Sequence, residues 1–380
     1  MTVHINSKDL QEILKTFHKL AKYSSVNSNI VPITFDFEPF RAIMMTDQVF
    51  VIAEPAASVE PPVHPYSFNP EILRELAFTD GEVSLYWDNE SAPLVLKNNH
   101  LRTTLRVAVP LPEFEEIPDK MESIEVPVGL LYAVTKFLSI PFMFLSTKKE
   151  LNPIQFRKNE EGFLEIMTED GYSLARLKTN IPVKLKELDI QVPRYIIESL
   201  FAKGDIHDET LVKIGVYGLK SLFSNKTTQI YSPSMNTDIS KFDLVLKDFK
   251  SKVSCEFVPK KLSDAIKPLI SIIPKKDKSS NTGLIVKFEL GKVSMSVEHK
   301  DTGDGYVDFV DGITDIYQEN SSRISTVNMT PQAFQDYTNL LDVAQASMFA
   351  NNRLVYYKGN FTSGENTTID IEYIFPTVLG

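Results

Sequence analysis

The side chains best suited to chemistry are dispersed along this chain. The six histidines include no pair at metal-ligand spacing, and they are His4, His18, His64, His100, His207 and His299. The sequence has no phosphate-binding glycine loop, dinucleotide fingerprint or nucleophile elbow. The one plausible carboxylate cluster, which a metal-dependent nuclease could use, comprises Asp301, Asp304, Asp308 and Asp311. We therefore expect a protein that is not an enzyme and that uses no cofactor or metal.

Composition and length describe an ordinary globular chain. It has 380 residues, of which 43% are apolar and 24% charged, so two or three domains are expected. Its one cysteine, Cys255, excludes an internal disulfide and indicates a reducing compartment. The first residues lack a signal-peptide pattern, and no apolar run approaches the roughly 18 residues of a membrane span. These features predict a cytoplasmic protein, in the host cytoplasm if it is viral, with no membrane partner.

Prolines mark where the helices that could position a functional site are expected to begin. Five β-type runs end at a proline that opens an amphipathic helix, at Pro70, Pro127, Pro193, Pro259 and Pro331. Proline suits the first helical turn because its missing N–H would have no intrahelical partner there. A sixth helix is expected to start at Ser7, capped by the serine hydroxyl, with apolar residues from Leu10 to Leu20 at helical spacing. The starts lie roughly sixty to seventy residues apart, which indicates a copied supersecondary unit.

Each repeat unit combines a strand, a helix and several further strands. Strand-like runs follow the first two helices at 33–37, 42–46, 49–53, 83–87, 94–96 and 101–107. A lone helix on three or four strands buries too little surface, so six βαβββ units should pair into three tandem domains. Each domain would place two helices on antiparallel sheet, which makes the fold class α+β. Polar stretches at 118–120 and 248–250 predict domains at 1–120, 121–250 and 251–380.

Three segments of the chain carry a family resemblance. Residues 151–154 read Leu-Asn-Pro-Ile, and residues 168–177 read Thr-Glu-Asp-Gly-Tyr-Ser-Leu-Ala-Arg-Leu. Residues 373–380 read Tyr-Ile-Phe-Pro-Thr-Val-Leu-Gly. Together with the six-unit repeat, they resemble the bacterial DNA polymerase sliding clamp, the β subunit of the replicative holoenzyme. Tyr172 and Ser173 stand where that family usually has histidine and arginine, which suits a phage clamp or another divergent one.

The resemblance implies a closed ring. Three domains per chain would make a homodimer of six domains, with helices lining a central hole and sheets on the outside. Duplex DNA would be held by encirclement and by weak, sequence-independent phosphate contacts. The first domain of one subunit would meet the third domain of the other. The residues expected at this subunit interface are Leu101, Leu105, Val107, Ile272 and Ile273.

On this interpretation, basic side chains of the helices face the DNA. The candidates are Lys15, Lys19, Lys22, Arg74, Lys136, Arg194, Lys203, Lys260, Lys261 and Lys267. Lys148 and Lys149 form a second basic spot in the loop before residue 151. The net charge of −10 alone argues against a nucleic-acid surface, but a local basic face can lie on an acidic protein. The alternative is that these residues are ordinary solvated helix faces and a solvated turn.

The resemblance also implies a pocket that captures short peptides with leucine or phenylalanine anchors. Such peptides would belong to the replicative DNA polymerase, the clamp loader and repair factors. Carried over by position, the pocket residues are Leu151, Gly171, Tyr172, Leu174, Leu244, Leu246, Tyr373, Ile374, Phe375, Pro376 and Thr377. For each apolar member, the alternative is plain core packing.

Two other functions stay open from the sequence. A non-enzymatic viral structural or assembly protein, built from repeated αβ units, would also lack catalytic motifs. It would need neither a ring nor basic residues on its helices. A nuclease built on the aspartate cluster would need a divalent metal and would cleave DNA, whereas a clamp would retain polymerase on circular DNA and slide off linear ends.

Overall fold

The chain forms two compact units with antiparallel sheets. The computed structural model describes residues 2–23, 31–36, 40–60, 65–68, 81–89, 92–99, 101–105, 121–138, 153–169, 173–201, 204–217, 220–235, 241–273, 284–289, 292–299, 301–309, 313–318, 325–329, 335, 345–351, 353–363 and 366–376. Unit 1 comprises Met1–Val128, Val192–Gly204 and Thr210–Met235, and unit 2 comprises Gly129–Gln191, Asp205–Glu209 and Asn236–Gly380. The predicted α+β class is confirmed.

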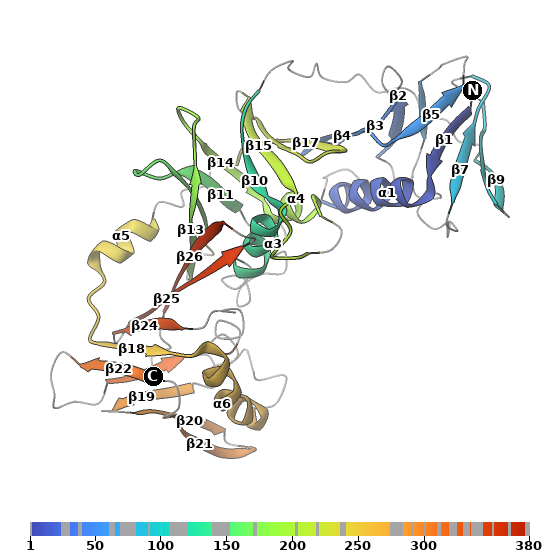
Figure 1. Cartoon of the computed structure of the whole chain (residues 1–380). Helices are drawn as coiled ribbons and strands as arrows, with labels where there is room; N and C mark the ends of the chain where they lie inside the picture. Colours follow the sequence, from blue (N-terminus) through green and yellow to red (C-terminus); the bar gives the residue numbers. More distant parts are fainter. Residues whose placement is uncertain are drawn as a thin grey trace. The chain divides into compact units, whose positions relative to one another are not determined.

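Helix α1 (Ser7–Ala21) lies beside strand β1 (Thr2–Asn6) in unit 1 (Figure 1). Its cap is Asn6, whose side chain accepts a hydrogen bond from the Lys8 backbone N–H at 2.9 Å. The expectation that the Ser7 hydroxyl caps this helix is therefore wrong, and Ser7 is buried instead. The predicted apolar face is confirmed, because every large apolar residue from Leu10 to Leu20 is buried.

Two sheets build unit 1. The order of the first is β5-β1-β7-β8-β9, with β1 (Thr2–Asn6), β5 (Ala57–Glu60), β7 (Glu82–Tyr86), β8 (Leu94–Asn98) and β9 (Leu101–Leu105). The order of the second is β10-β15-β16-β17-β4-β3-β2-β6. Its strands are β2 (Ile33–Asp36), β3 (Arg41–Met45), β4 (Phe50–Ala53), β6 (Tyr66–Phe68), β10 (Glu122–Pro127), β15 (Leu211–Tyr217), β16 (Lys220–Ser224) and β17 (Thr228–Pro233).

Aromatic side chains join these two sheets in one core. Trp87 follows β7 and is fully buried. Its ring centroid lies 5.2 Å from that of Tyr66 in β6 and 6.2 Å from that of Phe35 in β2. The second sheet also crosses the predicted boundary at residue 120, because β17 pairs with β4 in the register Ile230↔Val51. The predicted domain limits themselves stay a prediction.

Helix α4 (Arg194–Glu198) packs against α1 in unit 1. Pro193 is its cap residue, in agreement with the predicted start. The ring of Tyr195 stacks on that of Tyr23 at 4.4 Å, and burial raises the pKa of Tyr195 to about 12. The helix ends after one turn, where the Ser199 hydroxyl donates back to the Ile196 carbonyl at 2.6 Å.

The larger sheet of unit 2 has the order β14-β11-β12-β13-β26-β25-β24-β18-β22. Its strands are β11 (Pro153–Lys158), β12 (Phe163–Glu169), β13 (Leu174–Pro182), β14 (Asp189–Pro193), β18 (Val253–Phe257), β22 (Ile313–Gln318), β24 (Ala346–Ala350), β25 (Leu354–Ser363) and β26 (Thr367–Pro376). Because β13 pairs with β26, strands from the middle and the end of the sequence lie side by side.

Helix α3 (Val128–Phe137) packs on this sheet. The hydroxyl of Tyr373 in β26 donates to the Phe137 carbonyl at 2.9 Å, which ties the end of the helix to the strand. At the other end, the Gly129 N–H donates to the Asp208 carbonyl at 2.8 Å. A Cβ at Gly129 would lie 2.3 Å from the Ile206 carbonyl oxygen. Only glycine therefore lets the 205–209 segment cap this helix so closely.

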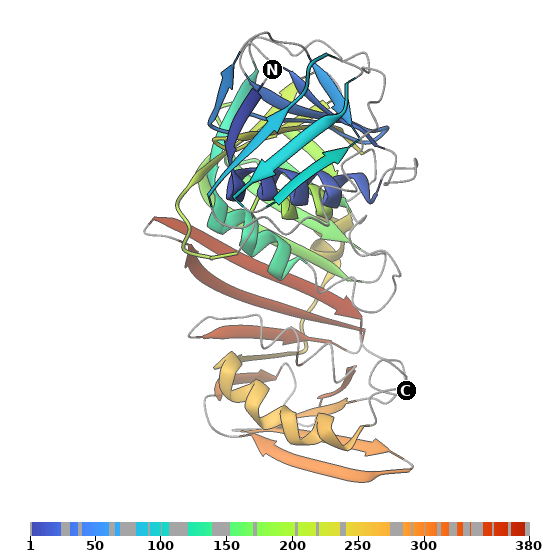
Figure 2. The same ribbon diagram turned by 90° about the vertical axis from the view of Figure 1, so that its right-hand side faces the viewer.

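The smaller sheet of unit 2 is covered by helix α6. Its order is β21-β20-β19-β23, with β19 (Leu284–Glu289), β20 (Lys292–His299), β21 (Gly303–Phe309) and β23 (Ser325–Met329). Helix α6 (Pro259–Ile272) starts at the predicted proline and lies over β20 and β21 (Figure 2). A Cβ at Gly305 would lie 2.3 Å from the Ile272 side chain, so this glycine makes room for the end of the helix.

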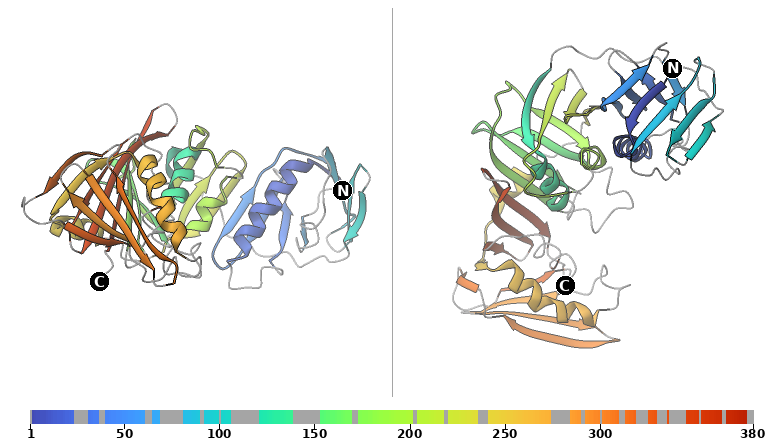
Figure 3. Two further views of the ribbon diagram at one scale, coloured as in Figure 1. Left: turned by 90° about the horizontal axis from the view of Figure 1, so that it is seen from below. Right: turned by 45° about the vertical axis from the view of Figure 1, so that its right-hand side comes forward.

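The remaining helix of the described residues is α5 (Lys241–Asp248), which the sequence did not predict. The helices expected after Pro70 and Pro331 lie outside the described residues, apart from the helical residue 335. The two further views in Figure 3 show α1 and α6 each lying against the strands of its own unit. Within the described residues, no helix has the length and apolar character needed to cross a membrane.

Candidate functional site

An apolar cluster in unit 2 brings together residues from three neighbouring strands. Met167 of β12, Leu174 of β13 and Ile374 of β26 are buried against one another, and Leu174 pairs with Ile374. Four partly buried side chains pack around these three. They are Val245 and Leu246 from α5, and Leu354 and Tyr356 from β25. We refer to these seven residues as the apolar cluster.

The alternation of side chains along each strand places a charged row beside this cluster. Residues two apart on a strand share a face of the sheet. Arg176 therefore lies next to Leu174 on β13, Glu372 next to Ile374 on β26, and Glu165 next to Met167 on β12. Helix α5 reaches both the apolar cluster and the charged row, because Leu246 belongs to the cluster and Asp243 pairs with Arg176.

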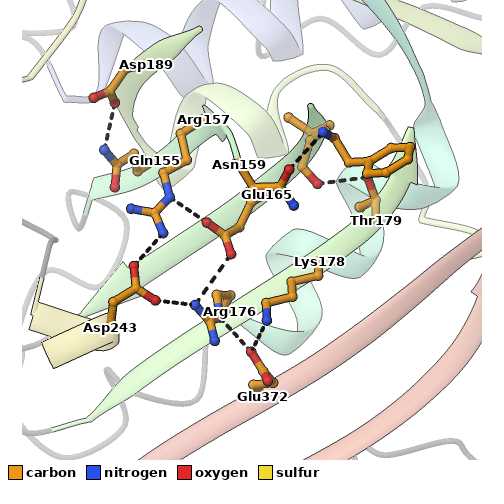
Figure 4. A network of polar contacts seen from close by, with 12 residues as sticks. Gln155, Arg157, Asn159, Glu165, Arg176, Lys178, Thr179, Asp189, Asp243 and Glu372 are labelled. Carbon is orange, nitrogen blue, oxygen red and sulfur yellow. Dashed lines mark hydrogen bonds and ion pairs between the residues drawn. The ribbon is translucent and has the colours of Figure 1, made fainter. Parts of the chain in front are cut away.

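The charged row is a network of ion pairs (Figure 4). Arg157 of β11 pairs with Glu165 (Nε to Oε2, 2.5 Å) and with Asp243 (Nη2 to Oδ2, 2.8 Å). Arg176 pairs with Asp243 (Nη1 to Oδ1, 2.6 Å) and with Glu372 (Nε to Oε2, 2.5 Å). A longer contact of 3.5 Å joins Arg176 Nη1 to Glu165 Oε1. The side chains of Glu165, Arg176 and Glu372 are at most 5% exposed, whereas that of Asp243 is 55% exposed.

The network shifts the pKa values of two of its carboxyl groups and of the neighbouring Tyr356 hydroxyl. Burial opposes ionisation of Glu372, but the charge of Arg176 and a hydrogen bond from the Tyr356 hydroxyl (2.6 Å) outweigh it and lower the pKa of this carboxyl. Partial burial likewise opposes ionisation of Asp243, and the hydrogen bond from Arg157 and the charge of Arg176 lower its pKa. Burial and the neighbouring Glu372 raise the pKa of Tyr356 far above its usual value. At neutral pH both carboxylates are ionised and Tyr356 is a donor.

The predicted pocket residues divide between the two faces of this sheet. Leu174, Ile374 and Leu246 meet in the apolar cluster. Leu244 lies on α5 but its side chain is 62% exposed. Tyr373 is fully buried on the opposite face, where it bonds to α3, so it is a core residue. Leu151, Gly171, Tyr172 and Thr377 lie outside the described residues, as do the side chains of Phe375 and Pro376.

Two of the predicted DNA-contacting residues of unit 1, Lys15 and Lys19, line a cavity of about 580 Å³ between α1, the end of α4 and residues 55–56 and 225–228. Lys15 is exposed at this cavity. Lys19 donates to the Glu198 carbonyl at 2.7 Å and lies 3.7 Å from its carboxylate. Arg194 pairs with the same carboxylate at 2.7 Å. Burial outweighs the attraction of Glu198 and lowers the pKa of the Lys19 ammonium. Lys19 and Arg194 are therefore less available than Lys15 for an external anion.

The remaining basic candidates occupy varied settings. Lys22 lies over the Tyr23 ring, 5.4 Å from its centroid, and Lys136 lies over the Phe137 ring at 5.8 Å. Lys260 and Lys261 are exposed in the first turn of α6. Lys267 is exposed and pairs with Asp264 at 2.5 Å. Arg74, Lys148, Lys149 and Lys203 lie outside the described residues.

Two sheet edges bear on the predicted subunit interface. Strand β9 ends one sheet of unit 1, and strand β21 ends the smaller sheet of unit 2. Leu101 of β9 is half-buried, and Tyr306 of β21 is 60% exposed. Ile272 is half-buried and packs against Gly305, whereas Ile273 is 1% exposed and belongs to the core. Val107 and the side chain of Leu105 lie outside the described residues.

Of the aspartates proposed as a nuclease cluster, Asp308 is engaged in other contacts. It accepts hydrogen bonds from the Ser294 hydroxyl at 2.9 Å and from the Tyr306 hydroxyl, and its carboxylate lies 3.4 Å from Lys292 Nζ. Asp311 lies outside the described residues. Within the described part of the chain, no group of three or more His, Cys, Asp or Glu residues could hold a metal ion.

The sequence did not point to the ion-pair network or to Val245 and Tyr356. Charged residues on strands usually face solvent, and here Arg176 and Glu372 are almost two hundred residues apart in the sequence. The available signal was the spacing of Leu174 and Arg176, which are two residues apart in the sequence. That pattern places a charge on the same face as Leu174, but it does not identify the partner.

Comparison with known proteins identifies the fold. No family model matches the chain, and no curated protein matches it. Among solved structures, a candidate DNA polymerase III beta subunit from Eubacterium rectale has 14% sequence identity and a TM-score of 0.82, with 100% of each chain covered. The sliding clamp of Bacillus subtilis has 14% identity and a TM-score of 0.80, covering 100% of this chain and 99% of that one. The beta subunit of Thermotoga maritima has 13% identity and a TM-score of 0.78, with the same coverage. The chain therefore has the fold of the DNA polymerase sliding clamps along its whole length.

Proposed function

We propose that this protein is a DNA sliding clamp, a processivity factor without enzymatic activity. Two copies close a ring around duplex DNA. A peptide-binding pocket on the ring tethers the replicative polymerase, and the clamp loader binds the same pocket. The observation that carries this proposal is the likeness to sliding clamps over 100% of the chain, despite identities near 14%. Fold alone does not define a function, so the proposal also draws on the surfaces of the molecule.

The helix surfaces support contact with DNA that ignores its sequence. Lys15, Lys260 and Lys261 are exposed on α1 and α6. Long, mobile ammonium groups attract phosphates without reading bases, which suits a protein that must move along the duplex. The acidic net charge of −10 limits adhesion of the remaining surface to nucleic acid. The exposed lysines would thus attract the phosphates only weakly, while the closed ring would keep the protein on the DNA.

The strand edges support closure into a dimer. Both β9 and β21 end their sheets in the described part of the chain, so each leaves one row of backbone N–H and C=O groups open to a further strand. If β9 of one copy pairs with β21 of another, two equivalent contacts close a ring of two chains. Leu101 and Tyr306 would then add side-chain contacts.

The apolar cluster supports capture of partner peptides. Leu354, Tyr356, Val245 and Leu246 are only partly buried around a buried floor formed by Met167, Leu174 and Ile374. A preformed apolar surface of this kind fits leucine or phenylalanine anchors of a short peptide. The polymerase and the loader would compete for it, as both must reach the same ring.

The test of the proposed function combines assembly and topology. Sedimentation at several protein concentrations should reveal a dimer in reversible equilibrium with the monomer. A gel-shift comparison should show stable complexes on closed circular DNA in the presence of a loader and none on linear DNA with free ends. Equal binding to both DNA forms, together with a monomer at every concentration, would contradict the proposal and favour a structural protein without a ring.

A further inference from the structure

Among the described side chains in the first turn of helix α5, Asp243 ties the helix to the sheet. Each carboxylate oxygen of Asp243 accepts a hydrogen bond from a different arginine (Figure 4). Arg157 donates to Oδ2 at 2.8 Å, and Arg176 donates to Oδ1 at 2.6 Å. Arg157 belongs to β11 and Arg176 to β13. The carboxylate therefore bridges two strands that are not adjacent, and it fixes α5 in two directions rather than one.

Buried carboxylates hold the two arginines in place. Glu165 contacts both of them, and Glu372 contacts Arg176. The side chains of Glu165 and Glu372 are only 2% and 4% exposed. A guanidinium that is paired with a buried carboxylate offers its remaining N–H groups in a fixed geometry. Asp243 thus docks onto prepared donors, unlike an ordinary surface carboxylate that must order a mobile partner.

The opposite end of α5 is held by different contacts. The Phe249 ring meets the Tyr356 ring edge-on at 6.0 Å, and the Lys250 carbonyl accepts a hydrogen bond from the Asn351 side chain at 3.1 Å. Val245 and Leu246 lie between the two attachments and pack against the buried residues of the apolar cluster. Their position over the sheet depends on both ends of the helix being held.

We infer that Asp243 is a positioning residue of the peptide-binding site: its two arginine contacts hold α5 as a preformed wall beside the apolar cluster. This inference rests on the proposed function, because it assigns a role within the pocket that the clamp would use. Asp243 does not contact the peptide. It raises affinity by keeping Val245 and Leu246 in place before the peptide arrives, so that binding does not have to order the helix.

The test compares three full-length variants. D243A removes both arginine contacts while keeping a good helix-forming residue. D243E retains the carboxylate and should restore binding in large part. D248A makes the same change of charge on the same helix, at an exposed residue for which no arginine contact exists among the described residues. The probe is a synthetic peptide with one leucine and one phenylalanine anchor, titrated by calorimetry.

The expected result follows from the fraction of molecules with α5 docked. If D243A lowers that fraction to about a tenth, the apparent affinity falls about tenfold, whereas D248A binds like the wild type. Hydrogen exchange of the α5 amides should accelerate in D243A and stay unchanged in D248A and D243E. This second readout separates positioning from a general loss of stability, because amides of α1 and α3 should exchange at the wild-type rate.

The two proposals can fail separately. If the wild type does not bind the peptide, the peptide-binding function falls, and hydrogen exchange still decides whether Asp243 holds α5. If the wild type binds but D243A binds equally well, the positioning role is overturned. Unchanged exchange of the α5 amides in D243A would overturn it as well, whatever the peptide does.

Discussion

The charges of α1 in unit 1 and those of the sheet beneath α5 in unit 2 are arranged in opposite ways. Lys15 is exposed, and Lys19 shares the carboxylate of Glu198 with one arginine. Beneath α5, Arg176 and Glu372 are almost completely buried and paired. Exposed charges interact weakly and are screened by salt, which suits transient contact with a moving polymer. Buried pairs are costly to break, which suits a site that must keep one shape.

Arg176→Met should have the largest effect, because it leaves two buried carboxylates without their shared partner. Removing one member of a buried ion-pair network typically costs about 3–5 kcal/mol of unfolding free energy. Urea denaturation followed by circular dichroism measures the loss. Lys267→Ala, which removes an exposed pair on α6, serves as the control and should leave the unfolding midpoint in place. Similar midpoints for the two variants would mean that the contrast between buried and exposed charges does not hold.

Leu174→Ala should weaken binding of a leucine- and phenylalanine-anchored peptide by about 2 kcal/mol, or roughly thirtyfold. Leu174 is 7% exposed in the centre of the apolar cluster, so its loss removes the floor under an anchor. Leu244 gives the matched control, because its side chain is 62% exposed on α5 and outside the cluster. Calorimetry on both variants sharpens the comparison. A larger loss for Leu244→Ala would move the binding surface to the outer side of α5.

Acid should affect the network of unit 2 in a defined direction. The carboxyl pKa values of Asp243 and Glu372 are lowered in the folded protein, while those of an unfolded chain are about 4. A lowered folded pKa adds stability above the unfolded value, and this contribution is lost as the pH falls through the folded pKa. The stability difference between wild type and D243A should therefore be constant from pH 7 to pH 5 and shrink below pH 4. Urea midpoints measured at each pH would contradict this if the difference grew in acid.

Single lysine changes on α1 should have the smallest effects. Lys15→Ala should lower the slope of log affinity for duplex DNA against log salt by about one, the loss of one phosphate contact. Lys19→Ala should change the slope less, because Lys19 is engaged by Glu198. Fluorescence anisotropy at several salt concentrations gives both slopes. An equal or larger change for Lys19→Ala would show that its contact with Glu198 opens when DNA binds.

The sequence predicted the parts of this molecule that local pattern controls. The buried face of α1 follows from helical spacing, and the starts of α4 and α6 follow from Pro193 and Pro259. Leu174 and Ile374 were predicted together only through the family resemblance, since no local pattern pairs residues two hundred positions apart. Tyr373 and Ile374 are neighbours on one strand, so alternation already excluded their lining the same face.

Other parts depended on contacts that the sequence does not display. Helix α5 is short and lacks a wide apolar stripe, and much of its placement comes from Asp243 and the arginines of two distant strands. The capping of α1 was predicted one residue late, because Asn6 and Ser7 are both good capping residues and only the backbone conformation of Asn6 distinguishes them.

Encirclement of DNA by two copies of the protein can be tested without a loader. Protein is allowed to thread onto a linear duplex, both DNA ends are blocked with biotin and streptavidin, and the complex is washed at high salt. A closed ring should stay on the blocked DNA through the wash and be released when a restriction enzyme cuts the duplex. Equal loss from blocked and unblocked DNA during the wash would contradict encirclement and leave only surface attraction.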